Sequence, residues 1–206
     1  MIAAVVLAAG ASLRMGEQKL LLPFGDSTVI GHVVDQVIAS EIDRTVVVTG
    51  HNRARIESAL AGRPVALVHN ENHAEGMLSS VRCGLAAIPE DVHAFLIVLG
   101  DQPNVTSSTV DALIEAFRSG QHGIVVPACG DRTGHPLVVA SRFRNAIMSR
   151  FDAVGLRGLL REHPGEVQRL DVPDSGVMFD MDTPEDYERE RARRNQSCGM
   201  AGASEE

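Results

Sequence analysis

The sequence contains no tryptophan, and aromatic residues make up only 3% of it. Proteins that bind single-stranded nucleic acid stack its bases on aromatic side chains, so this deficit argues against that class. The charge balance argues the same way, because 19 Lys and Arg residues stand against 27 Asp and Glu residues, for a formal charge of −8. Surfaces that bind nucleic acid or anionic membranes are basic, and we therefore expect neither partner.

Long apolar runs are also missing. The run at 2–9 is one of the longest, and it falls well short of the roughly 18 residues that a membrane span requires. No positive charge precedes it, as one would in a signal peptide, so we expect a cytoplasmic protein. The three cysteines are too few and too far apart to indicate a disulfide framework or a zinc knuckle; they are Cys83, Cys129 and Cys198.

The chain is long enough to close one sizeable core, with 206 residues of which 44% are hydrophobic. We expect a single domain over residues 1–194. Residues 195–206 are small and polar and are expected to form a disordered tail. One histidine pair, His69 and His73 around Glu71, could bind a metal, but the Asn and Gly residues beside it favour a loop.

Apolar segments alternate between strand and helix patterns along the chain. The runs at 2–7 and 94–99 are continuously apolar, which is typical of strands covered on both faces. Strands are expected at 2–7, 44–49, 65–69, 94–99, 123–126, 136–140, 167–172 and 176–179. Helices are expected at 29–38, behind Ser27 or Thr28 as cap, at 53–60 and 76–88, at 110–117 behind Ser107 or Ser108, and at 142–150, 156–162 and 184–194.

This alternation predicts an α/β fold, a three-layer α/β/α Rossmann-like sandwich with a mostly parallel central sheet. In such folds ligands bind at the carboxyl ends of the strands. The loops that follow the strands are therefore where candidate functional residues are sought.

The loop after the first strand has the composition of a polyphosphate-binding loop. Gly10 and Gly16 free the backbone to turn and expose its amides, while Ser12, Arg14 and Lys19 add donors. The spacing matches neither the dinucleotide-binding G-x-G-x-x-G pattern nor the Walker loop. Lys19 is the only lysine among eighteen arginines, which favours a need for a compact ammonium. Composition alone leaves open an ordinary glycine-containing surface turn.

Acidic residues follow two later extended segments. Asp101 stands directly after the buried run at 94–99, and Asp180 and Asp182 precede Thr183, the expected cap of the last helix. Two carboxylates from distant parts of the chain suit Mg²⁺, which takes the rest of its ligands from water and substrate phosphates. The alternatives are a turn at Asp101 and a set of helix-capping acids near Thr183.

Together these segments resemble the MobA-like nucleotidyltransferases, most of all their molybdenum cofactor cytidylyltransferase branch. The resemblance covers about residues 3–190. The motifs that carry it are Leu-Ala-Ala-Gly-x-Ser-x-Arg-Met-Gly-x-x-Lys at 7–19, Gly-Met-Leu-Ser-Ser at 76–80, Gly-Asp-Gln-Pro at 100–103, Gly-His-Pro at 134–136 and Asp-Met-Asp-Thr-Pro-Glu-Asp at 180–186.

The resemblance implies the nucleotide-diphospho-sugar transferase fold and an Mg²⁺-dependent reaction. A nucleotidyl group passes from a nucleoside triphosphate to a phosphorylated acceptor, and pyrophosphate is released. By position, catalysis falls to Arg14, Lys19 and Asp101, and metal binding to Asp101 and Asp180, with Asp182 as the other candidate ligand. Nucleotide binding falls to Leu7, Ala8, Ala9, Gly10, Ser12, Arg14, Lys19, Gly76, Ser80 and Asp101, and acceptor binding to His135 and Arg157.

We therefore expect transfer of CMP from CTP to a molybdopterin-type cofactor, with handover of the product to a molybdenum enzyme or its chaperone. Ala9 stands where the guanylyltransferase branch carries glycine, which predicts a narrower pocket that favours a pyrimidine. Two alternatives stay open. One is a nucleotidyltransferase for a sugar phosphate or another phosphate acceptor, including one that uses GTP, and the other is a non-catalytic nucleotide-binding module.

Overall fold

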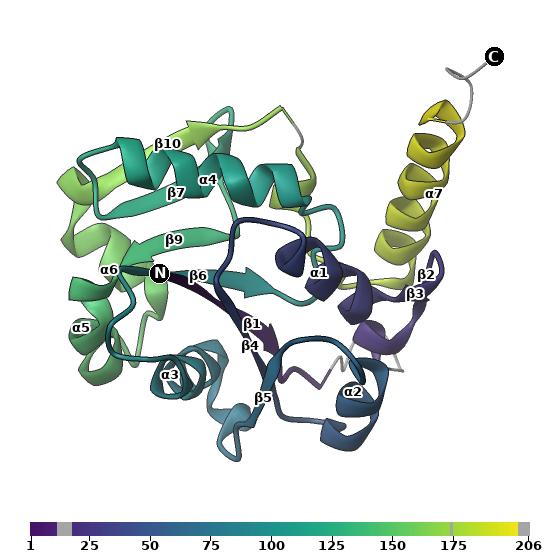
Figure 1. The fold of residues 1–206 in the computed structure, drawn as a ribbon, viewed down its shortest axis with the longest axis horizontal. Helices are drawn as coiled ribbons and strands as arrows, with labels where there is room; N and C mark the ends of the chain where they lie inside the picture. The colour runs from purple at the N-terminus through teal and green to yellow at the C-terminus, as the bar shows by residue number, and fades with distance from the viewer. Residues whose placement is uncertain (12–17, 174, 202–206) are drawn as a thin grey trace.

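The computed structural model describes residues 1–11, 18–173 and 175–201 of the chain. Its strands are β1 Ile2–Ala8, β2 Pro23–Phe24, β3 Ser27–Thr28, β4 Arg44–Thr49, β5 Ala66–His69, β6 Ala94–Leu99, β7 Ile124–Cys129, β8 Arg132–Thr133, β9 Leu137–Ala140 and β10 Val167–Asp171. Its helices are α1 Val29–Ile38, α2 Arg53–Ala59, α3 Met77–Ala87, α4 Ser107–Ser119, α5 Arg144–Ser149, α6 Leu156–Glu162 and α7 Pro184–Ala201. The predicted alternation of strands and helices is confirmed (Figure 1).

One central sheet runs through the molecule in the order β10-β7-β9-β6-β1-β4-β5, with β8 paired to β7. Strands β5, β4, β1 and β6 are parallel to one another. Strand β9 runs antiparallel to both of its neighbours, β6 and β7, and β10 returns parallel to β7. The sheet is therefore mostly parallel, as predicted.

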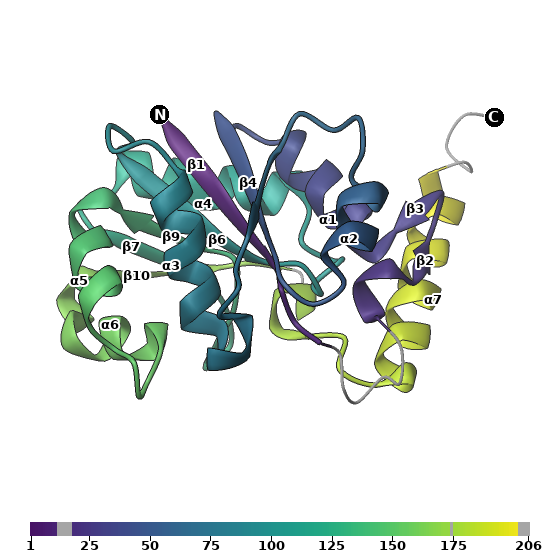
Figure 2. The same cartoon turned by 90° about the horizontal axis from the view of Figure 1, so that it is seen from below.

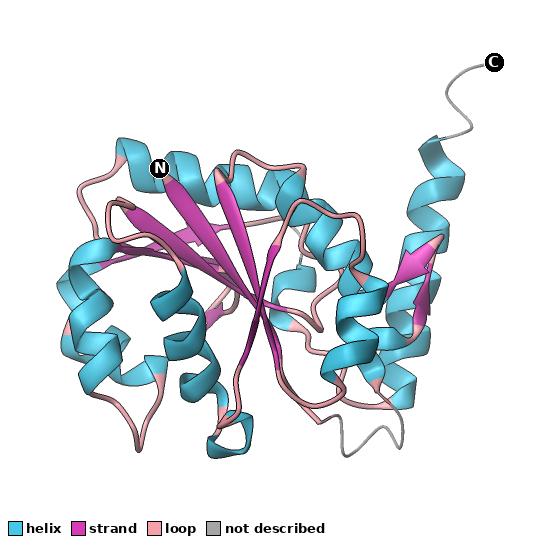
Figure 3. Cartoon of the chain, turned by 60° about the horizontal axis from the view of Figure 1, so that its bottom comes forward, coloured by secondary structure: helices cyan, strands magenta, loops and turns pink. Residues whose placement is uncertain are grey.

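Helices cover both faces of this sheet, as Figures 2 and 3 show. Alternate residues of β1 divide between two cores, because successive side chains of a strand point to opposite faces. Ala4 and Val6 pack with α1, α2 and α4, while Ala3 and Val5 pack with α3, α5 and α6. All four residues have no exposed surface, so β1 is buried on both sides and the three-layer prediction is confirmed.

The strand order places β1 at the point where the chain changes direction across the sheet. From β1 the chain builds β4 and β5 on one side and then returns to add β6 on the other. The carboxyl ends of β1 and β6 therefore lie side by side, at the crevice where open α/β sheets bind their ligands.

Two local predictions near this crevice are wrong. Thr106 caps α4 in place of Ser107 or Ser108, because its backbone is extended and its side chain accepts the amide of Thr109. Residues 175–178 form a 3-10 helix instead of the expected strand at 176–179. That single turn buries Val177 completely in the core of α1, α2 and α4.

The last helix is longer than expected. Helix α7 continues to Ala201, past the predicted end at Arg194, so residues 195–201 are helical where a disordered tail was expected. Extending a helix costs little once its first turn has formed, since each further residue adds a hydrogen bond. In Figure 1 this helix leads away from the body of the molecule. In the part of the chain that the structure describes, no helix is both long and apolar enough to cross a membrane.

Candidate active site

A cavity of about 400 Å³ opens at the crevice beyond β1 and β6. Its volume lies in the range of small-molecule sites. It combines an apolar floor with one ammonium and several carboxylates. The residues that line it are Leu7, Ala9, Gly10, Lys19, Leu20, His73, Gly76, Met77, Ser80, Leu99, Asp101, Asp180 and Asp182.

Strand β6 delivers Asp101 to this cavity through a close backbone contact. The amide of Gly100 donates to the carbonyl of Leu7 at 3.0 Å. A Cβ atom on residue 100 would lie 2.7 Å from that carbonyl oxygen, so only glycine fits there. The amide of Met181 donates to the carbonyl of Asp101 at 3.2 Å. This bond joins the Asp180–Asp182 segment to the end of β6, so the three carboxylates share one end of the cavity.

The Lys19 ammonium lies between two of these carboxylates. Its Nζ is 2.5 Å from Oδ2 of Asp101 and 2.9 Å from Oδ1 of Asp182. Burial alone would lower the pKa of Lys19, but the two carboxylates outweigh burial and raise it. The side chain is only 13% exposed, so the pair is shielded from solvent and Lys19 is charged at neutral pH.

The third carboxylate, Asp180, has a different partner. Nε2 of Gln102 donates to its Oδ1 at 2.7 Å. The residue is exposed overall, yet the protein packed around its carboxyl group removes part of its hydration and raises its pKa. The charges of Asp101 and Asp182 raise it further, while the Gln102 hydrogen bond and Lys19 oppose the rise. Negative charge is therefore in excess at this end of the cavity.

Such a donor set suits a hard divalent cation. Carboxylate oxygens are the protein ligands that Mg²⁺ and Mn²⁺ prefer, and an excess of negative charge raises affinity for them. Within the described ranges, no three His, Cys, Asp or Glu side chains already surround one point as a finished metal site. The Lys19 ammonium lies between Asp101 and Asp182 and pairs with both.

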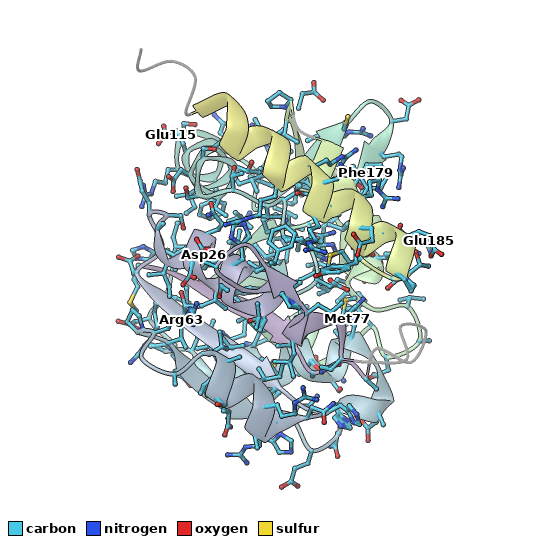
Figure 4. The ribbon with its side chains drawn as sticks, turned by 90° about the vertical axis from the view of Figure 1, so that its right-hand side faces the viewer. Asp26, Arg63, Met77, Glu115, Phe179 and Glu185 are labelled. Atoms are coloured by element: carbon cyan, nitrogen blue, oxygen red, sulfur yellow. The ribbon has the colours of Figure 1, made fainter. Side chains whose placement is uncertain are left out.

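The start of helix α3 contributes further residues to the lining of the cavity. Gly76 precedes it with a φ of 107°, a backbone conformation that favours glycine. Met77 is 53% exposed at this rim (Figure 4), and Ser80 lies one turn further along and is buried. An apolar rim with a buried hydroxyl below it is suited to a flat, partly polar ring such as a nucleobase.

The two predicted acceptor residues do not line the cavity. His135 lies within electrostatic reach of Asp101 and of Arg157. Burial lowers the pKa of His135 to about 4, an effect to which Arg157 adds and which Asp101 opposes, so the ring is neutral at pH 7. Its Nε2 is buried and, in the described part of the chain, has no hydrogen-bond partner.

Most of the residues predicted for nucleotide and metal binding lie together in the structure. Ala8 is the exception among those described, because it is completely buried beneath the cavity, in the core of α1, α2 and α4. Ser12 and Arg14 lie outside the described residues. His73 stands out in the sequence only as half of a possible metal-binding pair, and it lines the cavity. The lining residues Leu20, Met77 and Leu99 were not predicted, although Met77 lies inside the quoted 76–80 motif and Leu99 directly precedes the 100–103 motif.

A strand-end crevice with a shielded ammonium, three carboxylates and an apolar rim is suited to an enzyme that binds a nucleoside triphosphate. Residues 4–167 match the model of the MobA-like NTP transferase domain. The chain belongs to the MobA-like NTP transferase family, which confirms the resemblance found in its motifs. Its sheet has the nucleotide-diphospho-sugar transferase fold, and the chain is a nucleotidyltransferase.

Three known proteins illustrate the similarity. Over 184 residues the chain is 26% identical to the molybdenum cofactor cytidylyltransferase of Escherichia coli K12, covering 89% of this chain and 92% of that protein. Over 192 residues it is 31% identical to nicotine blue oxidoreductase of Paenarthrobacter nicotinovorans, covering 90% and 94%. The crystal structure of Rv0371C from Mycobacterium tuberculosis H37Rv in complex with manganese superposes with a TM-score of 0.75 at 29% identity, covering 91% and 96%.

Proposed function

We propose that this protein transfers CMP from CTP to a phosphorylated acceptor and releases pyrophosphate. The observation that carries the proposal is the placement of the Lys19 ammonium between Asp101 and Asp182, with Asp180 in the same cavity. A phosphoryl-transfer site needs both cationic groups for the phosphates and carboxylates that hold a metal ion. A module that only bound nucleotides would not need three carboxylates facing a phosphate site, so this arrangement favours catalysis.

The reaction then depends on positioning and on charge neutralisation. A phosphate monoester has a second pKa near 6, so at neutral pH the acceptor is already largely an anionic nucleophile and needs no general base. Asp101 and Asp180 would hold the divalent cation, with Asp182 as the alternative ligand, and the cation, when bound, would offset charge on the triphosphate. Lys19 would bind phosphate oxygens as a compact point charge. The manganese complex of Rv0371C supports a divalent metal, and we propose Mg²⁺ for this chain.

Two residues support CTP over GTP. Ala9 lines the cavity beside Leu7 and Gly10, and its methyl group narrows the space left for a base. Ser80 presents a hydroxyl to the same cavity from α3, where it is only 4% exposed. A small site with one buried polar group fits a pyrimidine better than a purine. The E. coli relative is a cytidylyltransferase by name, which agrees with this choice.

The acceptor is proposed to be a molybdopterin-type cofactor. The name of the E. coli relative supports this choice, whereas the name of the Paenarthrobacter relative refers to another reaction. Relatives of similar identity thus differ in what they act on, and the acceptor must be tested directly. His135 and Arg157 are proposed to bind it, since His135 lies within electrostatic reach of both Asp101 and Arg157. Handover of the product to a molybdenum enzyme or its chaperone would follow from this acceptor.

A pyrophosphate-release assay tests the proposal. The purified protein is incubated with Mg²⁺, with CTP or GTP, and with molybdopterin-type cofactor or a panel of sugar phosphates. We expect release that requires CTP and the cofactor together. Pyrophosphate release with sugar phosphates but not with the molybdopterin-type cofactor would show that the acceptor is a sugar phosphate. Release with GTP but not with CTP would show that the nucleotide is GTP. Nucleotide binding without turnover in every combination would indicate the non-catalytic module.

A further inference from the structure

The buried amide of Asn70 connects the end of β5 to α3 directly beside Ser80. Asn70 follows β5, and its backbone amide donates to the carbonyl of Thr49 at 2.8 Å. Its side chain is 5% exposed and reaches two neighbouring hydroxyls of α3. Nδ2 of Asn70 lies 2.9 Å from Oγ of Ser79 and 3.0 Å from Oγ of Ser80.

A backbone group fixes which way this amide points. The amide nitrogen and oxygen of an asparagine are distinguished by the partners that each can accept. The backbone N–H of Asn72 lies 3.0 Å from Oδ1 of Asn70, and an N–H can only donate. The atom facing Asn72 is therefore the oxygen, and the nitrogen faces the two serines. Both serine oxygens consequently accept a hydrogen bond from Asn70.

The hydroxyl protons of Ser79 and Ser80 differ in whether the protein supplies an acceptor for them. Oγ of Ser79 lies 2.9 Å from the carbonyl of Asn72 and 2.8 Å from the carbonyl of Gly76, and carbonyls can only accept. The Ser79 proton is therefore used inside the protein. Oγ of Ser80 has Asn70 as its one hydrogen-bond partner among the described residues. Ser80 lines the cavity, so its proton remains for a ligand there.

We propose that Asn70 is a positioning residue that makes Ser80 a hydrogen-bond donor toward the nucleobase. One of the two lone pairs of the Ser80 oxygen is engaged by Asn70, and its proton has no acceptor among the described residues, so the hydroxyl can donate to a base that presents an acceptor at this point. Cytosine offers its ring nitrogen N3 and its carbonyl O2 as such acceptors. The inference deepens the proposed function, because it rests on Ser80 facing the base.

A double-mutant cycle tests this mechanism. The dissociation constant of the nucleotide is measured by calorimetry for the wild type, Asn70→Asp, Ser80→Ala and the double variant. A carboxylate at position 70 can only accept, so it takes the Ser80 proton and turns the serine oxygen into an acceptor toward the base. We expect Asn70→Asp to weaken CTP binding at least ~5-fold more in the wild-type background than in the Ser80→Ala background.

Ser79 provides the matched control, since it is an adjacent serine bound to the same amide. The new negative charge of Asn70→Asp is present in every background, so its general repulsion of the triphosphate cancels in the cycle. In the Ser79→Ala background we expect the Asn70→Asp effect to keep its full size. Equal effects in the Ser80→Ala and wild-type backgrounds, or no effect in either, would overturn the inference.

The cycle also separates this inference from the proposed function. The wild type is first titrated with CTP and with GTP, and the cycle uses whichever nucleotide binds more tightly. Preference for GTP would contradict the choice of CTP, but guanine also carries acceptors, so the coupling between Asn70 and Ser80 can still be measured. Thermal unfolding of each variant checks that the variant is folded under the conditions of the titration.

Discussion

The Nζ atom of Lys19 and the Oδ2 atom of Asp101 are 2.5 Å apart, and they come from the loops that follow β1 and β6. Strands β1 and β6 are neighbours in the sheet and run parallel, so the fold itself brings opposite charges together. Asp182 shares the same ammonium from the far end of the chain. A single positive charge thereby offsets part of the negative charge at the proposed metal site.

The first prediction is that Lys19 competes with the divalent cation. Replacing it in Lys19→Met removes the ammonium that now lies between Asp101 and Asp182. We expect the dissociation constant for Mn²⁺ without nucleotide to fall at least ~5-fold, because unpaired carboxylates attract the ion more strongly. Binding is followed by the electron paramagnetic resonance signal of free Mn²⁺. The control Lys19→Arg keeps a positive charge and should bind Mn²⁺ like the wild type, whereas an unchanged constant in Lys19→Met would contradict the prediction.

The second prediction separates the candidate metal ligands. Asp101→Asn and Asp180→Asn should each reduce turnover at least ~10-fold, or about 1.4 kcal/mol of barrier, because an amide neither offsets the charge of the cation nor holds it as firmly. Circular dichroism should show an unchanged fold. If Asp180→Asn keeps wild-type turnover at saturating Mg²⁺ while Asp182→Asn does not, the second ligand is Asp182.

The third prediction concerns Arg82, which anchors the turn between α5 and α6 to α3. Its guanidinium donates to the carbonyl of Ile147 at 2.9 Å, to the carbonyl of Arg150 at 2.7 Å and to Asp152 at 2.5 Å. Removing all three bonds in Arg82→Ala should lower the free energy of unfolding by about 2 kcal/mol, measured by urea denaturation. Asp152→Asn removes only the ion pair and should have a smaller effect. Equal effects would show that the backbone bonds contribute nothing.

The fourth prediction is a pH dependence of stability at Glu166. Its carboxylate accepts the backbone amide of Gly123 at 2.9 Å and Nη2 of Arg142 at 2.6 Å. Both partners lower the pKa of Glu166 below its ordinary value of 4.5, and the Gly123 amide has the larger effect. The stabilisation is therefore complete above that value and is lost as the pH falls through the lowered pKa of the folded state.

Glu166→Gln should thus have a lower melting temperature than the wild type at pH 7, and the gap should close as the pH falls below about 4.5. Differential scanning calorimetry across this range measures it. Glu115→Gln is the control, since Glu115 is exposed on α4 and has no ion pair within the described ranges (Figure 4). A gap that stayed constant down to pH 3 would show that the carboxylate charge plays no part.

The sequence predicts structure best where the same physical requirement, such as burial, applies to several consecutive residues. Strands β1 and β6 must be apolar on both faces, and this uninterrupted pattern predicts them and the crevice at their ends. The glycine loop and the acids after β6 then follow as candidate site residues. Contacts between distant single residues leave no such pattern. The Lys19–Asp182 pair spans 163 positions, and nothing in the local sequence of either residue indicates the other.

The sequence also does not show which of several similar neighbouring residues takes a given structural role. The hydroxyl residues Thr106, Ser107 and Ser108 could each cap α4, and the extended backbone at Thr106 makes that residue the cap. Ser79 and Ser80 are chemically identical, and their roles differ because the carbonyls of Asn72 and Gly76 accept the proton of Ser79 alone. The turn at 175–178 was not predicted because a buried apolar residue such as Val177 can belong to a 3-10 helix as well as to a strand.

The long separation between Lys19 and Asp182 also orders events during translation. Ribosomes make the amino-terminal part first, so β1, the loop with Lys19 and β6 emerge before the residues at 180–182 exist. An incomplete nascent chain therefore lacks two of the three carboxylates, and Lys19 has only Asp101 as a counterion. Chains whose synthesis stops before residue 180 would therefore lack the complete proposed metal site.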